Sequence, residues 1–239
     1  MIAELNPSER GALGTTASVF RGVRLSTRIT AASHAVEGGD WCETFVLSDA
    51  VVALSIGDVA GHGPSAVATR LLASQAVRDA ASYGLDPAET LAAANSLLCA
   101  LDPEIYATAF FALLDTRRGI VSFANAGHPP PLIVGPAGSW FLSYEKPDLP
   151  LGLKSESVAT VHVARMPART LLVLYTDGVT EHERRPLVGE AQLHEAALLA
   201  YGSSAPHAAP AIGALMALTP ANADDAAILT AWMPRTRTF

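Results

Sequence analysis

The amino-acid sequence predicts an α+β layered sandwich, because its expected strands come in groups and do not alternate one by one with helices. Three extended stretches come first, a pair of helices follows, and a longer series of strands leads to two further helices and a closing strand. The chain has 239 residues, of which 50% are hydrophobic, so it can bury a full core. One compact domain is therefore expected, over residues 22–235.

The first expected strands form a meander. Residues 1–21 have weak periodicity and are interpreted as an N-terminal tail or a short regulatory segment, so the folded part is expected to begin near Val23. A tight turn at residues 49–50 separates the second strand from the third. In order, the three extended segments are RLSTRITAAS, WCETFVLS and VVALSIGD.

Two helices are expected next. Apolar residues recur at helical spacing after Pro64, which suits a first helical position, and Gly84 is expected to end this helix. Asp86 has the character of an N-cap with Glu89 at the third position, which is the pattern of a capping box before ETLAAANSLLCAL. Because so few residues separate them, the two helices are expected to form an antiparallel pair.

Strands resume after the helical pair, separated by turns rich in Gly and Pro. Two further helical stretches are expected at residues 190–201 and 208–218, before a last strand, AAILTAW. The expected strands of this second half are YATAFFALLD, GIVSFANAG, PLIV, WFLSY, SVATVHVA and TLLVLYTD.

Composition argues against several classes of partner. The formal charge is -7, and the 16 Lys and Arg residues form no basic run, so nucleic acid is not expected as a partner. Cys42 and Cys99 are too few for a disulfide framework or a paired-cysteine zinc site, which fits a reducing compartment. No secretory signal is recognised, and no apolar run approaches the roughly 20 residues that cross a bilayer. We therefore expect a soluble, cytoplasmic protein without a membrane partner.

Four aspartates stand at the ends of expected strands. Two of them, Asp40 and Asp224, come just before a strand. The other two, Asp58 and Asp177, come just after one. If neighbouring strands run antiparallel, two strand starts and two strand ends lie at the same rim of the sandwich. The four carboxylates are then expected to converge.

Converging carboxylates repel each other, so protons or cations must compensate them. Oxygen-only ligands favour Mg²⁺ or Mn²⁺ over zinc. Two such ions about 4 Å apart can share a bridging water, lower its pKa and hold phosphoryl oxygens for in-line attack. The turn Gly61-His62-Gly63 supports this interpretation, because it leads into the helix at Pro64, whose N-terminal amides favour an anion.

Six motifs follow one another between residues 31 and 232, namely GGDW, GDVAGHG, NAGHPP, PLGL, YTDGVTE and DDAAIL. In this combination the chain resembles the bacterial branch of the PPM metal-dependent serine/threonine phosphatases, the SpoIIE/RsbU type. The resemblance implies a four-layer α-β-β-α sandwich with two antiparallel sheets, two Mn²⁺ or Mg²⁺ ions, and hydrolysis of phosphoserine or phosphothreonine. It also implies stress-response signal transduction, a phosphorylated regulatory protein such as an anti-sigma-factor antagonist as substrate, and room for an activating partner protein.

The resemblance also assigns metal ligands. Asp58 would bridge both ions, with the Val59 carbonyl beside it. Asp177 and Asp224 would complete the first ion. Asp40 would serve the second ion, directly or through water. Asp58 and Asp40 are thus the expected catalytic carboxylates.

Three positions depart from the family's pattern or leave an alternative open. Asp225 stands beside Asp224, and spacing alone does not separate the two as ligands. In the wider class a proton-donating histidine stands two residues after the bridging aspartate; here that position is Ala60, and His62 becomes the candidate general acid. Glu43 stands where the family often has Asp, so a carboxylate is retained there.

Two further questions stay open at the level of sequence. His128 in NAGHPP either lines the rim of the site or makes structural hydrogen bonds in a Pro-rich turn, and the second interpretation is favoured. The chain could also be a catalytically idle phosphatase-like binding module, although it retains all four acids, or a hydrolase of small phosphoesters, although it has no Walker-type motif.

Overall fold

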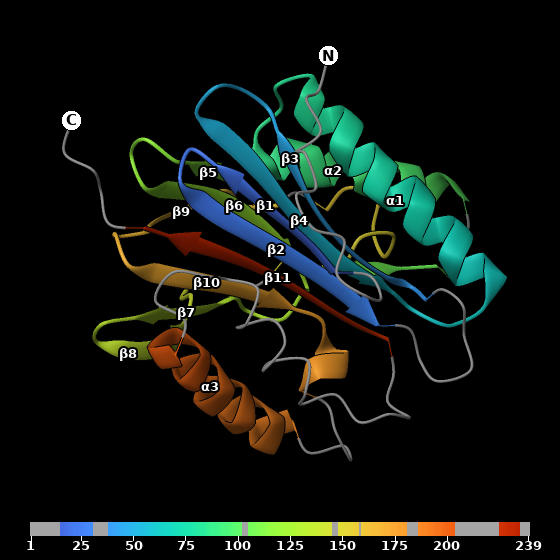
Figure 1. The fold of residues 1–239 in the computed structure, drawn as a ribbon. Coiled ribbons are helices and arrows are strands. Elements are labelled where there is room, and N and C mark those ends of the chain that lie inside the picture. Colours follow the sequence, from blue (N-terminus) through green and yellow to red (C-terminus); the bar gives the residue numbers. More distant parts are fainter. Residues whose placement is uncertain are drawn as a thin grey trace. The chain divides into compact units, whose positions relative to one another are not determined.

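Two antiparallel sheets form the framework of the chain (Figure 1). The structure, a computed structural model, describes residues 15–30, 38–101, 105–144, 148–157, 159–180, 186–203 and 225–234. One sheet has five strands in the order β3-β4-β5-β6-β9, and the other has six in the order β1-β2-β11-β10-β7-β8. Neighbouring strands in both orders pair antiparallel, which confirms the predicted α+β class with two antiparallel sheets.

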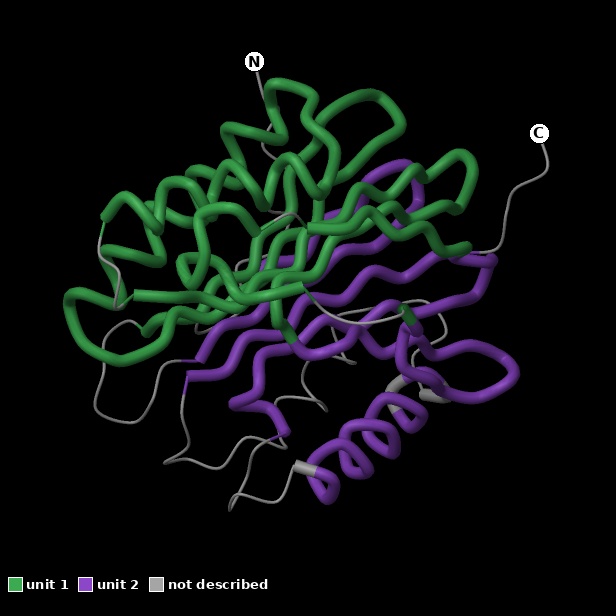
Figure 2. Tube along the Cα trace, turned by 180° about the vertical axis from the view of Figure 1, so that it is seen from behind, with its two compact units in different colours: residues 1–4, 34–128, 144–165 green, residues 5–33, 129–143, 166–239 purple. Residues whose placement is uncertain are grey.

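The chain divides into two compact units, each built around one of the sheets (Figure 2). Each of the two units combines segments that are far apart in the sequence. Unit 1 comprises residues 1–4, 34–128 and 144–165, and unit 2 comprises residues 5–33, 129–143 and 166–239. The expected single domain over residues 22–235 stays a prediction.

The five-stranded sheet of unit 1 carries both described helices of this unit on one face (Figure 1). Side chains alternate between the two faces of each strand, and every second one packs against the helices. Trp41, Phe45 and Phe111 fill this interface together with Leu91 and Leu98 of the second helix. The elements are β3 (Asp40–Val46), β4 (Val51–Val59), α1 (Pro64–Ser82), α2 (Pro87–Leu101), β5 (Ala107–Asp115), β6 (Ile120–Ala126) and β9 (His162–Arg165).

The predicted starts of both helices are confirmed. Pro64 is the first residue of α1, where its missing N–H leaves no hydrogen bond unmade. At the start of α2 the Glu89 N–H donates to Asp86 Oδ1 at 2.9 Å, and the Asp86 N–H donates back to Glu89 Oε2 at 2.9 Å. This reciprocal pair is the capping box that the sequence predicted.

In unit 2 one described α-helix, α3 (Pro186–Ser203), packs against β7 and β8. It begins four residues before the predicted position, at a proline that a first helical turn accommodates. The helix predicted at residues 208–218 lies outside the described residues. The strands of this unit are β1 (Thr15–Phe20), β2 (Val23–Thr30), β7 (Leu132–Gly135), β8 (Gly138–Phe141), β10 (Thr170–Tyr175) and β11 (Ala226–Met233).

Strand β1 lies inside the segment 1–21 that was expected to be a tail, so the sheet begins earlier than the predicted start near Val23. It pairs with β2 through a two-residue turn at Arg21 and Gly22, which have φ angles of 49° and 85°. Two successive positive φ angles match the right-handed twist of a tight hairpin. Among the described residues, no helix has the length and apolar character needed to cross a membrane.

Candidate functional site

Two of the predicted carboxylates face each other across neighbouring strands of unit 1. Asp40, the first residue of β3, pairs directly with Asp58 near the end of β4. Side chains opposite each other in an antiparallel pair share one face of the sheet, with their Cβ atoms about 4.5–5.5 Å apart. Asp40 is only 2% exposed. The structure therefore brings these two acids together, on the face of the sheet that points away from α1 and α2.

The backbone beside this pair supplies a further oxygen. The Val59 N–H donates to the Gly39 carbonyl at 3.3 Å, which holds the two strand ends together. A Cβ at Gly39 would lie 2.8 Å from the Val59 carbonyl oxygen and 3.5 Å from Asp58 Oδ1. The Val59 carbonyl and the Asp58 carboxylate thus approach the same point of the Gly39 backbone, and glycine leaves that point open.

This donor set fits a hard divalent cation. Like charges placed directly opposite each other in a sheet are destabilising, so the pair Asp40 and Asp58 is compensated best by a positive charge. Carboxylate and carbonyl oxygens are the ligands that Mg²⁺ and Mn²⁺ prefer. The half of the predicted site that belongs to unit 1 is therefore chemically suited to such an ion.

The other predicted acids belong to unit 2. Asp177 opens a 3₁₀ turn (Asp177–Val179) directly after β10. Gly178 in this turn packs against the Asp225 carbonyl so closely that a Cβ would overlap it. Thr176 fixes the same junction, because its Oγ1 accepts the Ala227 N–H at 2.8 Å. The turn after β10 is thus fastened to the start of β11, which follows Asp225 directly.

The convergence of all four acids stays a prediction. Asp224 lies outside the described residues, whereas Asp225 is described and half-buried. Within the described ranges, no group of three or more His, Cys, Asp or Glu side chains lies close enough to hold a metal ion. The choice between Asp224 and Asp225 as the ligand also stays open.

His62 lies in the loop between β4 and α1, and its side chain is exposed. Gly61 and Gly63 on either side have φ angles of 99° and 83°, in the left-handed region that favours glycine. The loop starts two residues after Asp58, so His62 follows that carboxylate closely along the chain. Its role as general acid stays a prediction.

Glu43, three residues after Asp40, lies on the opposite face of β3. Its Oε2 accepts a hydrogen bond from Arg78 Nη2 of α1 at 2.7 Å. The same guanidinium stacks over the Phe45 ring, 4.7 Å from its centroid. Glu43 therefore belongs to the interface between sheet and helix and does not join Asp40 and Asp58.

Sequence reasoning missed Thr108, which pairs with Asp58 on the side away from Asp40. Its Oγ1 lies 3.0 Å from Nδ1 of His128, a ring that is 3% exposed. The structural interpretation of His128 is thus correct in that the residue is buried and hydrogen-bonded, but its partner stands beside a predicted ligand. The signal for Thr108 was available, because it is the one hydroxyl in the otherwise apolar segment ATAFFALL.

Tyr144 is linked to His128 through hydrogen bonds of Asn125. Asn125 Nδ2 donates to the Tyr144 hydroxyl at 2.6 Å. Burial, and secondarily the nearby negative charge of Asp148, raises the pKa of Tyr144 to about 12. The phenol therefore stays neutral at physiological pH and keeps its hydroxyl proton.

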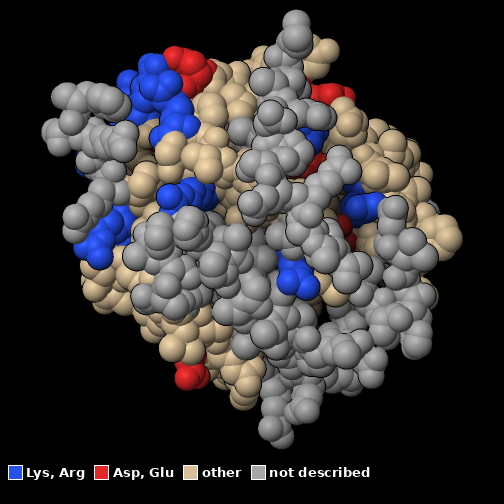
Figure 3. Space-filling model, viewed as in Figure 1, with Lys and Arg blue, Asp and Glu red and all other residues tan. Residues whose placement is uncertain are grey.

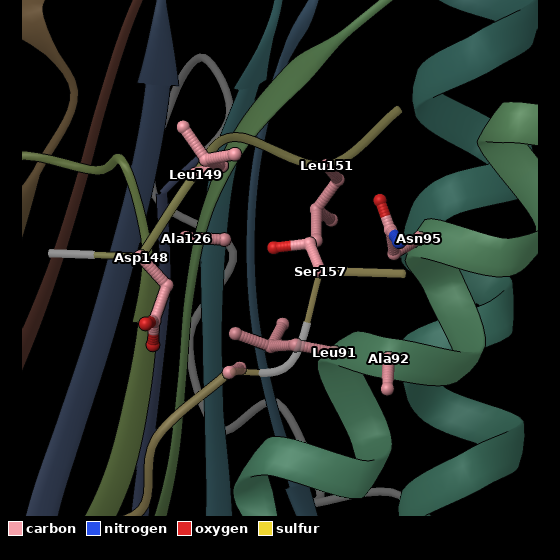
Figure 4. Close-up of a pocket in the computed structure, with 9 residues that line it drawn as sticks. Leu91, Ala92, Asn95, Ala126, Asp148, Leu149, Leu151 and Ser157 are labelled. Carbon is pink, nitrogen blue, oxygen red and sulfur yellow. The ribbon is translucent and has the colours of Figure 1, made fainter. Parts of the chain in front are cut away.

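A small pocket lies between α2 and the segment that carries the PLGL motif (Figure 4). Leu91, Asn95, Leu151 and Ser157 are among the residues that line it. Asn95 Oδ1 accepts the Gly152 N–H at 2.8 Å, so the helix side chain holds this segment in place. None of the predicted metal ligands lines the pocket, so it is not part of the predicted metal site.

Charged side chains are spread out on the face drawn in Figure 3. Among the described residues, some Lys and Arg side chains lie together at the upper left of this view, next to an acidic side chain, and others stand singly.

Comparison with known proteins identifies relatives. A family model described as stage II sporulation protein E (SpoIIE) matches residues 48–233. Stage II sporulation protein E of Priestia megaterium is 27% identical over 158 residues, which are 64% of this chain and 27% of that protein. Phosphoserine phosphatase RsbU of Bacillus subtilis (strain 168) is 25% identical over 138 residues, which are 57% of this chain and 41% of that protein. The chain thus spans less than half the length of these two relatives.

Solved structures share the fold. The RsbU and RsbW domains of Rv1364c from Mycobacterium tuberculosis match with a TM-score of 0.81 and 27% identity, over 96% of this chain and 65% of that chain. RsbX in complex with magnesium matches with a TM-score of 0.72 at 14% identity, over 91% of this chain and 98% of that one. A third match is the catalytic domain of the serine threonine protein phosphatase PstP in complex with 2 manganese ions. Its TM-score is 0.61 at 14% identity, over 87% of this chain and 97% of that chain. At 14% identity the last two similarities establish the fold alone.

Proposed function

The chain belongs to the SpoIIE family, and we propose that it is a metal-dependent protein serine/threonine phosphatase. The observation that carries this proposal is the pairing of Asp40 with Asp58 at the ends of β3 and β4, beside the Val59 carbonyl. Two acids in register on one face, one of them 2% exposed, are costly unless they serve a cation. A relative that is 25% identical carries the name phosphoserine phosphatase.

The proposed cofactor is a pair of Mn²⁺ or Mg²⁺ ions. Asp58 and the Val59 carbonyl would hold them together with Asp40, while Asp177 and Asp224 would add the remaining carboxylates. When bound, such ions lower the pKa of a shared water and stabilise negative charge on phosphoryl oxygens. Magnesium in the RsbX structure and manganese in the PstP structure support this choice of ion.

The chain's own residues would then bind, orient and protonate. Hydrolysis breaks the bond between phosphorus and the oxygen of the substrate serine or threonine, and that oxygen must gain a proton. His62 is the proposed donor, because it is exposed in the loop directly after β4 and can reach a bound phosphoprotein. The N-terminal amides of α1 follow the same loop and favour a phosphate dianion.

The proposed substrate is a phosphorylated regulatory protein in the cytoplasm, of the anti-sigma-factor antagonist type. The similarity to RsbU and to the RsbU and RsbW domains of Rv1364c supports this class of substrate. An activating partner protein, as part of stress-response signalling, belongs to the same proposal.

The test is hydrolysis of p-nitrophenyl phosphate by the purified chain with and without Mn²⁺. We expect activity that requires the metal and falls at least about 100-fold in Asp58→Asn, because one charge of the metal site is lost. Asp49→Asn is the matched control, since Asp49 lies in the turn between β3 and β4 and pairs with Arg117. Wild-type protein that binds Mn²⁺ but hydrolyses no phosphoester would point to an idle binding module.

A second assay addresses the substrate class. Phosphoserine and phosphothreonine peptides are compared with nucleotides and other small phosphoesters at equal concentration. We expect a higher kcat/KM for the peptides. A preference for small phosphoesters would replace the proposed function with that of a small-molecule hydrolase.

A further inference from the structure

Three polar residues stand in one row across the sheet of unit 1. Asp40 on β3 is opposite Asp58 on β4, and Asp58 is opposite Thr108 on β5. Residues opposite each other in neighbouring strands project from the same face, so the Thr108 hydroxyl is on the side of the two carboxylates. A hydroxyl at this place can donate one hydrogen bond, and an ionised carboxylate can only accept.

His128 holds that hydroxyl from the other side. Its Nδ1 lies 3.0 Å from Thr108 Oγ1. The ring is 3% exposed, so bulk water does not compete for this contact. The direction of the hydrogen bond depends on which nitrogen of the ring carries the proton.

The backbone of His128 is fixed by Asn125. The His128 N–H donates to Asn125 Oδ1 at 2.7 Å, and Asn125 Nδ2 donates to the His128 carbonyl at 2.9 Å. Asn125 is 1% exposed and also donates to the Tyr144 hydroxyl at 2.6 Å. The imidazole is therefore presented to Thr108 by a buried, doubly anchored turn, and it has little freedom to turn away.

Proton counting selects one direction. If Nδ1 accepted the Thr108 proton, the hydroxyl would turn only lone pairs towards Asp58, and two acceptors would face each other. If Nδ1–H donates to Thr108 Oγ1, the hydroxyl keeps its own proton for the carboxylate side.

We propose that His128 and Thr108 are positioning residues for Asp58, with His128 Nδ1–H donating to Thr108 Oγ1 and the Thr108 hydroxyl donating to the Asp58 carboxylate. This inference rests on the proposed function, because it assigns support to the carboxylate expected to bridge the metal ions.

Such a hydrogen bond fixes which carboxylate oxygen faces a cation and which faces the protein. Partners that orient a metal ligand typically change metal affinity or activity by about 10–100-fold when they are removed. The pair Thr108 and His128 is expected to act in this way although neither touches the metal or the substrate.

The first test measures Mn²⁺ affinity by isothermal titration calorimetry. Thr108→Val keeps the shape of the side chain but removes the hydroxyl, and we expect the affinity to fall about tenfold. Thr108→Ser keeps a hydroxyl at this position, so its Mn²⁺ affinity is expected to stay within about threefold of wild type. Thr44→Val is the matched control, because Thr44 lies on the same face of β3 but opposite Leu54. Equal affinities in wild type and Thr108→Val would overturn the inference.

The second test needs no metal. Nitrogen-15 NMR of the His128 ring in metal-free protein reports which nitrogen carries the proton. We expect Nδ1–H in wild type and in Thr108→Ser. A ring protonated at Nε2 alone would overturn the inference even if Thr108→Val failed to fold.

The two proposals fail in different ways. Wild-type protein without measurable Mn²⁺ binding or phosphatase activity would reject the proposed function. Active, metal-binding wild type together with an unchanged Thr108→Val variant would reject the positioning role alone. In an active enzyme, a positioning role also predicts a lower kcat for Thr108→Val with a nearly unchanged KM, whereas general loosening of the fold would lower the unfolding temperature.

Discussion

Gly178 lies against the carbonyl of Asp225, at the junction where the turn after β10 meets the entry of β11. The contact is between backbone atoms, so no flexible side chain can move aside to admit a larger residue. Because Asp177 precedes this glycine directly, the contact holds the turn that carries the predicted ligand Asp177 against the backbone of Asp225.

Gly178→Ala is expected to destabilise the protein strongly. The added Cβ overlaps the Asp225 carbonyl, and forcing extra volume into packed backbone costs about 1–3 kcal/mol or more. Urea unfolding measures the loss. Gly135→Ala is the control in the same unit, since its Cβ would meet the Trp140 ring at 3.4 Å and Thr170 Oγ1 at 4.0 Å, which are ordinary contacts. A Gly178→Ala variant as stable as Gly135→Ala would contradict the packing described for this junction.

Asp40→Asn is expected to stabilise the metal-free protein while weakening its response to metal. Removing one of two opposed negative charges relieves about 0.5 kcal/mol of repulsion, which corresponds to about 1–2 °C in unfolding temperature. Stabilisation by Mn²⁺ depends on its affinity, so the variant should gain less from added metal than wild type. Thermal unfolding in EDTA and in Mn²⁺ measures both effects. An equal gain from Mn²⁺ in both proteins would show that Asp40 does not serve the ion.

Glu43→Gln is expected to leave Mn²⁺ affinity within about twofold of wild type, well below the 10–100-fold typical of residues that support a metal ligand. Its carboxylate faces α1 and pairs with Arg78, on the side of β3 away from Asp58. Both side chains of this ion pair are partly exposed, so its loss should cost at most about 1 kcal/mol. Calorimetric titration of Mn²⁺ into Glu43→Gln and Asp40→Asn makes the comparison. A similar loss of affinity in both would place Glu43 at the metal site after all.

The sequence was sufficient wherever local patterns decide the structure. The capping box at Asp86 and Glu89 follows from residue types three positions apart, and the structure shows both of its hydrogen bonds. Glycine next to an acid likewise marked the strand ends near Asp40 and Asp58. Both residues lie just inside their strands, Asp40 as the first residue of β3 and Asp58 one residue before the end of β4, and not outside them as predicted. Alternation along a strand could also have separated Glu43 from Asp40, because residues three apart point to opposite faces.

Other features depend on contacts between distant segments. Strand β1 was missed because its hairpin turn has Arg21 at a positive φ, where Asn or Gly would have signalled a turn. The contact of Thr108 with His128 joins residues 20 positions apart and depends on the pairing of β5 with β6. The place of Thr108 beside Asp58 depends on the register between β4 and β5. No local pattern specifies that register, so the row of polar side chains beside Asp58 became visible only in the folded chain.

Asn95→Ala is expected to loosen the segment that carries the PLGL motif. The Asn95 side chain is 2% exposed, and it accepts the Gly152 N–H at 2.8 Å while donating to the Lys154 carbonyl at 2.9 Å. Alanine would leave the buried Gly152 N–H without its acceptor, and an unsatisfied buried group costs about 1–3 kcal/mol. We therefore expect a lower free energy of unfolding and faster hydrogen exchange at Gly152.

Ser96→Ala serves as the control for this helix, because the Ser96 hydroxyl donates only to the Ala92 carbonyl and is exposed. Its effect should stay within about 0.5 kcal/mol. Hydrogen exchange followed by mass spectrometry compares the two variants over residues 148–157. Because Asn95 reaches this segment from α2 by side-chain bonds alone, exchange there that is unchanged in Asn95→Ala would mean that the backbone contacts between Ala107 and Leu151 hold the segment without it.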